Sequence, residues 1–142
     1  MPSSFVDQIR VMQLQPSNHT LTPVDTIHLG MPVDNLSVDR RSGDLYAAAF
    51  PDVLTLLKSF KDPYHVDSPT TVWRIRKRAA GQVGSGAGAA YEVEKVVEDR
   101  EAKVLGGGTV ARHDSETGRL FIGGMFVSCG KGAILRSSWL GC

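Results

Sequence analysis

Two oxygen-bearing side chains, Asp34 and Asn35, stand next to each other directly before an apolar stretch that begins at Leu36. Calcium takes about six to eight oxygen ligands and accepts both carboxylate and amide oxygens. Placed just before a strand, the pair can project two such ligands from the rim of a sheet. A structural interpretation is also open, because Asp-Asn is a common turn pair and Pro32 precedes it here.

A second candidate, the run His113-Asp114-Ser115, contains the three residue types of a hydrolase triad. Immediate neighbours on one turn cannot form the serial hydrogen bonds that such a triad requires, so we set this run aside. Zinc chemistry is not predicted either, because Cys129 and Cys142 lie near the C-terminus, isolated from the scattered histidines.

The composition places the chain among compact single domains, with 142 residues of which 42% are hydrophobic. Lysine and arginine number 16 against 15 acidic residues, so the chain has no strong electrostatic field that would attract nucleic acid. The basic run 74–78 is interpreted as a solvated strand face. No apolar run approaches the roughly 20 residues that cross a bilayer. The first residues lack the basic and apolar regions of a signal peptide, so we expect neither a transmembrane segment nor a secretion signal.

Apolar residues recur at a spacing of two in segments rich in β-branched and aromatic residues, which predicts a mostly β chain. The predicted strands are 9–11, 24–29, 36–38, 45–49, 72–75, 91–97, 109–112 and 120–123. One short helix is predicted over 52–60, where Pro51 and Asp52 suit a first turn and an apolar helical stripe follows. The glycine- and alanine-rich stretch 77–90 predicts a flexible surface loop that joins two groups of strands.

A weak internal repeat relates two short segments of the chain. The pattern Asp-x-x-[Ser/Thr]-Gly-x-Leu-aromatic occurs at 39–46 and again at 114–121. A polar link with glycine near its end, set between apolar strands, predicts a hairpin, because glycine supplies the positive φ of a tight connection. The spacing of 75 residues exceeds the roughly 40–50 of a propeller blade, and the helix and the glycine-rich loop account for the excess. Taken alone, the two hairpins favour a propeller over a sandwich only weakly.

A longer ordered series of motifs resembles the serum paraoxonase/arylesterase family. The series consists of Asp7-Gln-Ile-Arg-Val11, Asn18-His-Thr-Leu-Thr-Pro23, Met31-Pro-Val-Asp-Asn-Leu-Ser-Val-Asp39, Ser42-Gly-Asp-Leu45, Thr71-Val-Trp-Arg-Ile75, Gly108-Thr-Val-Ala111 and Leu120-Phe-Ile-Gly123. Paraoxonases are six-bladed β-propellers that carry two calcium ions in a central tunnel and hydrolyse lactones and aryl esters. The resemblance implies an all-β, partial six-bladed β-propeller, about the last two blades, with one short helical insertion.

The resemblance also assigns roles to particular residues. Asp34 and Asn35 match ligands of the catalytic calcium, and Thr109 and Phe126 match residues that line the substrate pocket. Without the family, Thr109 would be interpreted as a strand threonine and Phe126 as a core phenylalanine. Asn18, in Asn18-His-Thr20, coincides with a glycosylation sequon of the animal enzymes, and the family implies an extracellular or secretory location.

The sequence departs from the family at two places. Phe50-Pro51 stands where the animal enzymes carry a histidine before the proline, which predicts a more apolar pocket edge. After Ser128 the similarity ends, so we divide the chain into C-terminal propeller blades at 1–128 and a non-homologous tail at 129–142, and interpret it as a truncated or frame-shifted product. The family's histidine pair and its remaining calcium ligands lie in blades outside this sequence.

Three functional hypotheses follow. The first is a calcium-dependent arylesterase or lactonase that acts on a small ester or lactone in the full ring and is inactive as this fragment. The second is a non-catalytic propeller fragment or pseudoenzyme that binds a partner. The third is another six-bladed hydrolase of the gluconolactonase or strictosidine synthase type. In each case exposed blade edges predict poor solubility or self-association.

Overall fold

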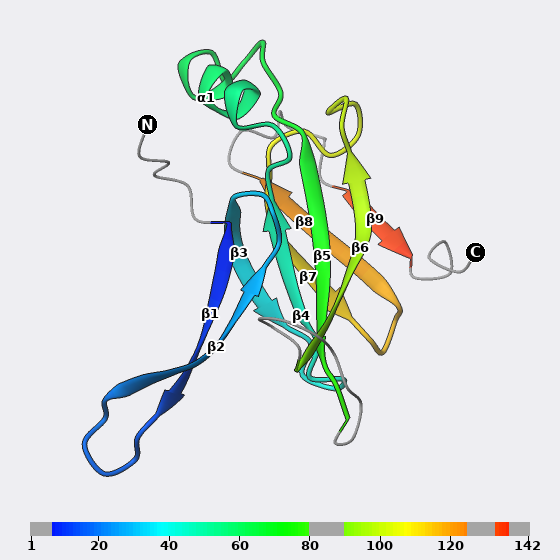
Figure 1. The fold of residues 1–142 in the computed structure, drawn as a ribbon. Coiled ribbons are helices and arrows are strands. Elements are labelled where there is room, and N and C mark those ends of the chain that lie inside the picture. The colour runs from blue at the N-terminus through cyan, green and yellow to red at the C-terminus, as the bar shows by residue number, and fades with distance from the viewer. Residues whose placement is uncertain (1–6, 80–89, 125–132, 137–142) are drawn as a thin grey trace.

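The computed structural model describes residues 7–79, 90–124 and 133–136, and this part of the chain contains nine strands and one helix (Figure 1). The prediction of a mostly β chain with one short helix is confirmed. The elements are β1 (Gln8–Leu14), β2 (Leu21–His28), β3 (Val33–Val38), β4 (Leu45–Ala49), α1 (Val53–Lys61), β5 (Thr70–Lys77), β6 (Tyr91–Asp99), β7 (Gly108–Asp114), β8 (Arg119–Gly124) and β9 (Ala133–Arg136).

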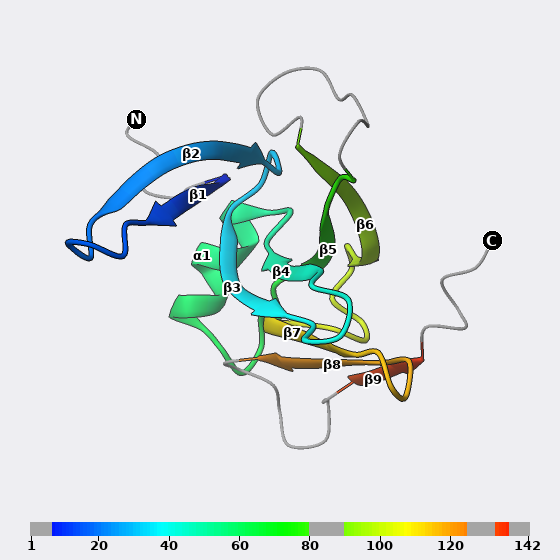
Figure 2. The same cartoon turned by 90° about the horizontal axis from the view of Figure 1, so that it is seen from below.

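The strands form three antiparallel sheets, which we call sheets A, B and C. Sheet A pairs β1 with β2, sheet B has the order β3-β4-β5-β6, and sheet C has the order β7-β8-β9. Seen from below in Figure 2, sheet B lies between the β1–β2 hairpin and sheet C. The first strands of sheets B and C, β3 and β7, are in contact with each other.

Both faces of sheet B contribute residues to the core, and successive side chains of one strand point to opposite faces. In β4, Tyr46 packs in a cluster shared with sheet C, whereas its neighbour Ala47 packs in a cluster shared with sheet A. The cluster between sheets B and C contains Tyr46, Val72, Val96, Leu105, Ala111, Leu120 and Ile122. The cluster between sheets A and B contains Ile9, Ile27, Leu29, Ala47 and Ile75. The chain is therefore a stack of sheets packed face to face.

The two copies of the sequence repeat form equivalent hairpins, as predicted. One joins β3 to β4 and the other joins β7 to β8. Gly43 and Gly118 have φ values of 76° and 62°, the left-handed region that a side chain disfavours. In the first hairpin the Asp39 carboxylate accepts hydrogen bonds from the backbone N–H groups of Arg41 and Ser42 at 2.9 and 3.2 Å. The repeat thus makes β3 and β7 the corresponding first strands of two sheets.

Helix α1 begins one residue later than predicted, because Asp52 is its N-cap. The Asp52 carboxylate accepts hydrogen bonds from the backbone N–H groups of Leu54 and Thr55 at 2.9 and 3.1 Å, which satisfies two N–H groups without helical partners. Lys58 and Lys61 lie in the last turn, where positive charge is favourable. Within the described residues, this helix is too short to span a bilayer.

Two features of the fold differ from the prediction. The stretch 77–90 connects β5 to β6, which are neighbours in sheet B rather than members of separate groups of strands; its residues 80–89 lie outside the described part. Strand β9 was not predicted, and it lies inside the proposed tail 129–142. Its backbone pairs antiparallel with β8, with Leu135 opposite Leu120, so this segment supplies the third strand of sheet C.

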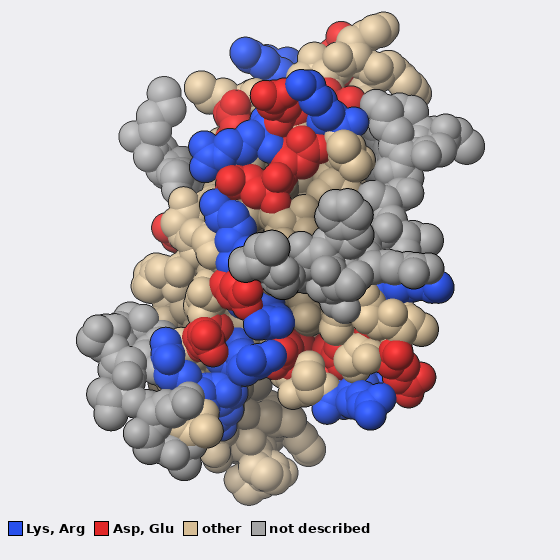
Figure 3. All heavy atoms as spheres, turned by 90° about the vertical axis from the view of Figure 1, so that its right-hand side faces the viewer, with Lys and Arg blue, Asp and Glu red and all other residues tan. Residues whose placement is uncertain are grey.

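Charged side chains of opposite sign lie next to one another on the face of the molecule shown in Figure 3. Two arginines of the basic run at 74–78 are paired, since Arg74 forms an ion pair of 2.5 Å with Glu94 and Arg76 forms one of 2.9 Å with Asp44. The interpretation of this run as a strand face is therefore consistent with its position on β5.

Candidate functional site

The predicted calcium ligands lie inside β3 and not before it. The register between β3 and β4 shifts between Val33 and Leu36, so Asp34 and Asn35 occupy an irregular stretch of the strand. A bulge of this kind leaves residues out of the ladder and can redirect their side chains. Both side chains are exposed. The predicted strand began at Leu36, whereas β3 begins at Val33 and includes the pair, and the bulge that sets the direction of the two side chains was not visible in the sequence.

The side-chain amide of Asn35 is fixed by two hydrogen bonds. Its Nδ2 donates to Asp34 Oδ1 at 3.1 Å and to the backbone carbonyl oxygen of Thr109 at 3.0 Å. Thr109 lies on β7, so this second bond joins sheets B and C. Because the amide nitrogen is committed to these partners, the carbonyl oxygen of Asn35 is the atom that the side chain offers to a ligand.

Asp34 and Thr109 line the same small cavity, which has a volume of about 40 Å³. Its walls are mainly apolar and include Phe50, Leu56 and Phe60. Partial burial in these surroundings raises the pKa of the Asp34 carboxyl above its usual value. The structure thus brings Asp34, Asn35 and Thr109 together beside Phe50, whereas Phe126 lies outside the described residues.

The chemistry of these donors suits calcium, although the set is small. Asp34 offers a carboxylate and Asn35 an amide oxygen, both of which calcium accepts. Within the described residues, no group of three or more His, Cys, Asp or Glu side chains is placed to hold a metal ion. Two side-chain oxygens are well short of the roughly six to eight that calcium takes. The residues present therefore match part of a calcium site.

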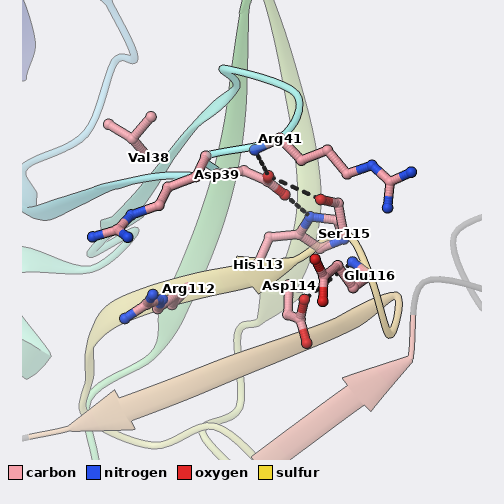
Figure 4. Close-up of a pocket in the computed structure, with 9 residues that line it drawn as sticks. Val38, Asp39, Arg41, Arg112, His113, Asp114, Ser115 and Glu116 are labelled. Atoms are coloured by element: carbon pink, nitrogen blue, oxygen red, sulfur yellow. Dashed lines mark hydrogen bonds and ion pairs between the residues drawn. The ribbon is translucent and has the colours of Figure 1, made fainter.

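A second polar cluster lies at the other end of β3 and β7, at the two hairpins (Figure 4). Asp39 is buried, with 3% of its surface exposed, and its Oδ2 lies 2.6 Å from Nδ1 of His113. Ser115 donates from Oγ to Oδ1 of Asp39 at 3.0 Å. Burial alone would raise the pKa of Asp39, but hydrogen bonds from His113, the backbone N–H groups of Arg41 and Ser42, and Ser115 lower it to about 2.

This cluster is not a nucleophile with its base, because Ser115 donates to Asp39 and not to His113. It borders a cavity of about 240 Å³ with Arg40, Arg41 and Arg112 in its wall. That cavity is larger than the one beside Asp34, but its charged lining is a poor match for an aryl ester. The contact between Asp39 and His113 was not predicted from the sequence. The one sequence feature that pointed to it was the aspartate repeated at the start of each hairpin.

The predicted sequon lies in the connection between β1 and β2. Asn18 is exposed, and its side-chain oxygen accepts hydrogen bonds from the backbone N–H and the hydroxyl of Thr20 at 3.1 and 2.7 Å. Glycosylation at Asn18 stays a prediction.

Two comparisons with known proteins bear on this site. A family model described as Arylesterase matches residues 1–129, which include Asp34, Asn35 and Thr109. The matched range contains every described strand except β9. The comparison with curated proteins found no match.

Proposed function

The chain belongs to the arylesterase family, that of the paraoxonases, and from this premise we propose that it forms part of the calcium-binding wall of a hydrolase for aryl esters or lactones. One observation supports this most directly. Asn35 is held by Thr109 of the neighbouring sheet, beside Asp34 and at the edge of an apolar cavity. A carboxylate, an oriented amide and an apolar wall are three of the parts that such a site requires.

We further propose that sheets B and C are neighbouring blades of a β-propeller, with β3 and β7 as their innermost strands. Sheet A would be the outer part of the preceding blade. The face-to-face stacking of the three sheets and the equivalent hairpins support this arrangement. In it, Asp34 and Asn35 would border the central tunnel.

In the proposed site, calcium would supply a Lewis acid that polarises the ester carbonyl. Asp34 would contribute charge to its binding, and Asn35 would present an oxygen whose direction is set by the carbonyl of Thr109. Phe50 and Phe60 would contact the apolar part of the substrate. Exclusion of water by these side chains strengthens the electrostatic interactions of the site.

The 142-residue chain alone is expected to show no appreciable hydrolysis of phenyl acetate, with or without calcium, because it offers so few calcium ligands. Its affinity for Ca²⁺ should be weak, with a dissociation constant on the order of 1 mM or higher. Calorimetric titration with Ca²⁺ measures this affinity. Asp34→Asn should reduce it further, whereas Glu116→Gln, which removes an exposed carboxylate elsewhere, should leave it unchanged.

Clear calcium-dependent turnover by the purified chain would overturn the proposed inactivity. Equal effects of Asp34→Asn and Glu116→Gln would overturn the assigned ligand. A chain that bound neither calcium nor ester would instead favour a propeller segment without catalytic function.

Self-association is expected of this chain, because sheets A and C each have a face that no other described element covers. On the β1–β2 hairpin, Leu14, Leu21 and Val24 are 56%, 60% and 55% exposed. Apolar side chains gathered in this way favour contact with other copies. Size-exclusion chromatography with light scattering should show oligomers whose size increases with concentration. A monodisperse monomer that melts cooperatively would count against this prediction and against the partial propeller.

A further inference from the structure

Two residues of β3 and the residue that follows it connect this strand to β7, and we call this row of contacts the polar seam. Asn35 donates to the carbonyl of Thr109 at 3.0 Å, and Ser37 donates from Oγ to the carbonyl of Ala111 at 2.5 Å. Asp39 completes the row by its 2.6 Å contact with His113. Ser37 and Asp39 are spaced by two and therefore lie on one side of the chain, and Asn35 reaches the same neighbour from the irregular stretch of β3.

The seam joins strands that belong to different sheets. Strand β3 pairs with β4 and β7 pairs with β8, so the two are not neighbours in a backbone ladder. The side-chain contacts between β3 and β7 therefore set the position of one strand relative to the other along the strand axis. A shift of one residue would move the Thr109 carbonyl by about 3.3 Å, which is more than a hydrogen bond tolerates.

Asp39 and His113 form the most firmly held contact of the seam. The Asp39 carboxylate is buried and also accepts hydrogen bonds from Arg41, Ser42 and Ser115. The ring of His113 stacks on that of Tyr46 in sheet B, with centroids 5.0 Å apart. His113 is thus held by a hydrogen bond on one side and by an aromatic contact on the other.

We propose that Asp39 and His113 are positioning residues for Asn35, the candidate metal ligand at the opposite end of the seam. They fix the register of β7 against β3, and this register keeps the carbonyl of Thr109 within reach of the Asn35 amide. The importance of this role for calcium rests on the proposed function, but the positioning of Asn35 can be tested without any metal. The competing explanation is that the pair stabilises only its own hairpins.

Two variants of His113 separate the hydrogen bond from the ring contact. His113→Phe keeps an aromatic ring against Tyr46 and removes the donor to Asp39. His113→Asn keeps a donor near the position of Nδ1 and removes the ring. The control is Ser115→Ala, which removes another donor to the same carboxylate but lies beyond β7 in the hairpin.

The readout is the side-chain amide signal of Asn35 in ¹⁵N NMR spectra of the 142-residue chain, assigned with Asn35→Ala. In His113→Phe we expect solvent exchange of these amide protons to rise about fivefold, as the bond to Thr109 is lost. His113→Asn and Ser115→Ala should keep exchange near the wild-type rate. If His113→Phe lowers stability and leaves the Asn35 amide unchanged, the pair acts only on its hairpins and the proposal is overturned.

A calcium titration extends the test to the candidate site. His113→Phe should weaken Ca²⁺ affinity by about tenfold, as is usual when a partner that orients a ligand is lost. If the wild-type chain binds no calcium, the proposed function fails at this step, while the Asn35 amide still decides whether Asp39 and His113 position it. Should His113→Phe not fold, rapid exchange of the Asn35 amide in folded His113→Asn, which keeps the donor to Asp39, would overturn the assignment.

Discussion

Replacing Leu120 with alanine is expected to lower the free energy of unfolding by about 3 kcal/mol. Leu120 lies on β8, is 2% exposed, and belongs to the cluster that joins sheets B and C. Removing its side chain leaves a cavity between two sheets whose backbones are held by their own ladders and cannot collapse fully around it. Urea denaturation followed by circular dichroism at several concentrations measures the loss.

The neighbouring residue on the same strand provides the control. Phe121 points to the opposite face of β8 and is 40% exposed, so Phe121→Ala should cost about 1 kcal/mol or less. If the two substitutions had equal effects, sheet C would not pack on sheet B through the face that contains Leu120. Such a result would contradict the packing of sheet C on sheet B, on which the candidate site depends.

Acid should destabilise the chain through Asp39 as the pH falls from about 4 to about 2. The pKa of Asp39 is about 2 in the folded chain against an ordinary value of 3.8, so folding favours its ionised form. Stability from this group is therefore present above pH 4 and is lost as the pH falls through the folded pKa. The expected loss is about 2 kcal/mol, measured by chemical denaturation across this pH range.

The variant Asp39→Asn should be less stable at neutral pH and should show a shallower decline between pH 4 and 2. Asp114→Asn is the matched control, because Asp114 is the corresponding residue of the second hairpin but its carboxylate accepts hydrogen bonds only within that hairpin. Its pH profile should follow the wild type more closely. Identical slopes for wild type and Asp39→Asn would show that other carboxylates, such as Glu98 with its pKa of about 2, govern the acid response.

Local patterns in the sequence were sufficient for most of the fold. Alternation identified the longer strands, and glycine at 43 and 118 identified the hairpins, because each signal depends on residues close in the chain. Strand β9, Ala-Ile-Leu-Arg, was missed because its apolar residues do not alternate with polar ones and it lies in the stretch interpreted as a non-homologous tail. Its assignment to sheet C depends on pairing with β8, which a local pattern cannot express.

The candidate site was predictable only in part. Asp34 and Asn35 were identified by their oxygen chemistry and by resemblance. Their proximity to Thr109 was not predicted. The repeat nevertheless contained this information, since a spacing of 75 residues makes Asp34 and Thr109 the second residues of β3 and β7. The contact between Asp39 and His113 spans 74 residues and required the packing of two sheets to appear.

The run of three fully buried alanines in β4, Ala47 to Ala49, has a geometric consequence for the whole stack. On the face toward sheet A, β4 contributes Ala47 near the β3 edge of sheet B, whereas the larger Ile75 fills the space between the sheets farther out on β5. On the other face, β7 lies against β3 and β4 more than against β5. If the layers of a complete ring narrow toward the β3 and β7 side in this way, each layer is rotated relative to the one before it, and successive layers turn about an axis on that side, as the proposed propeller requires.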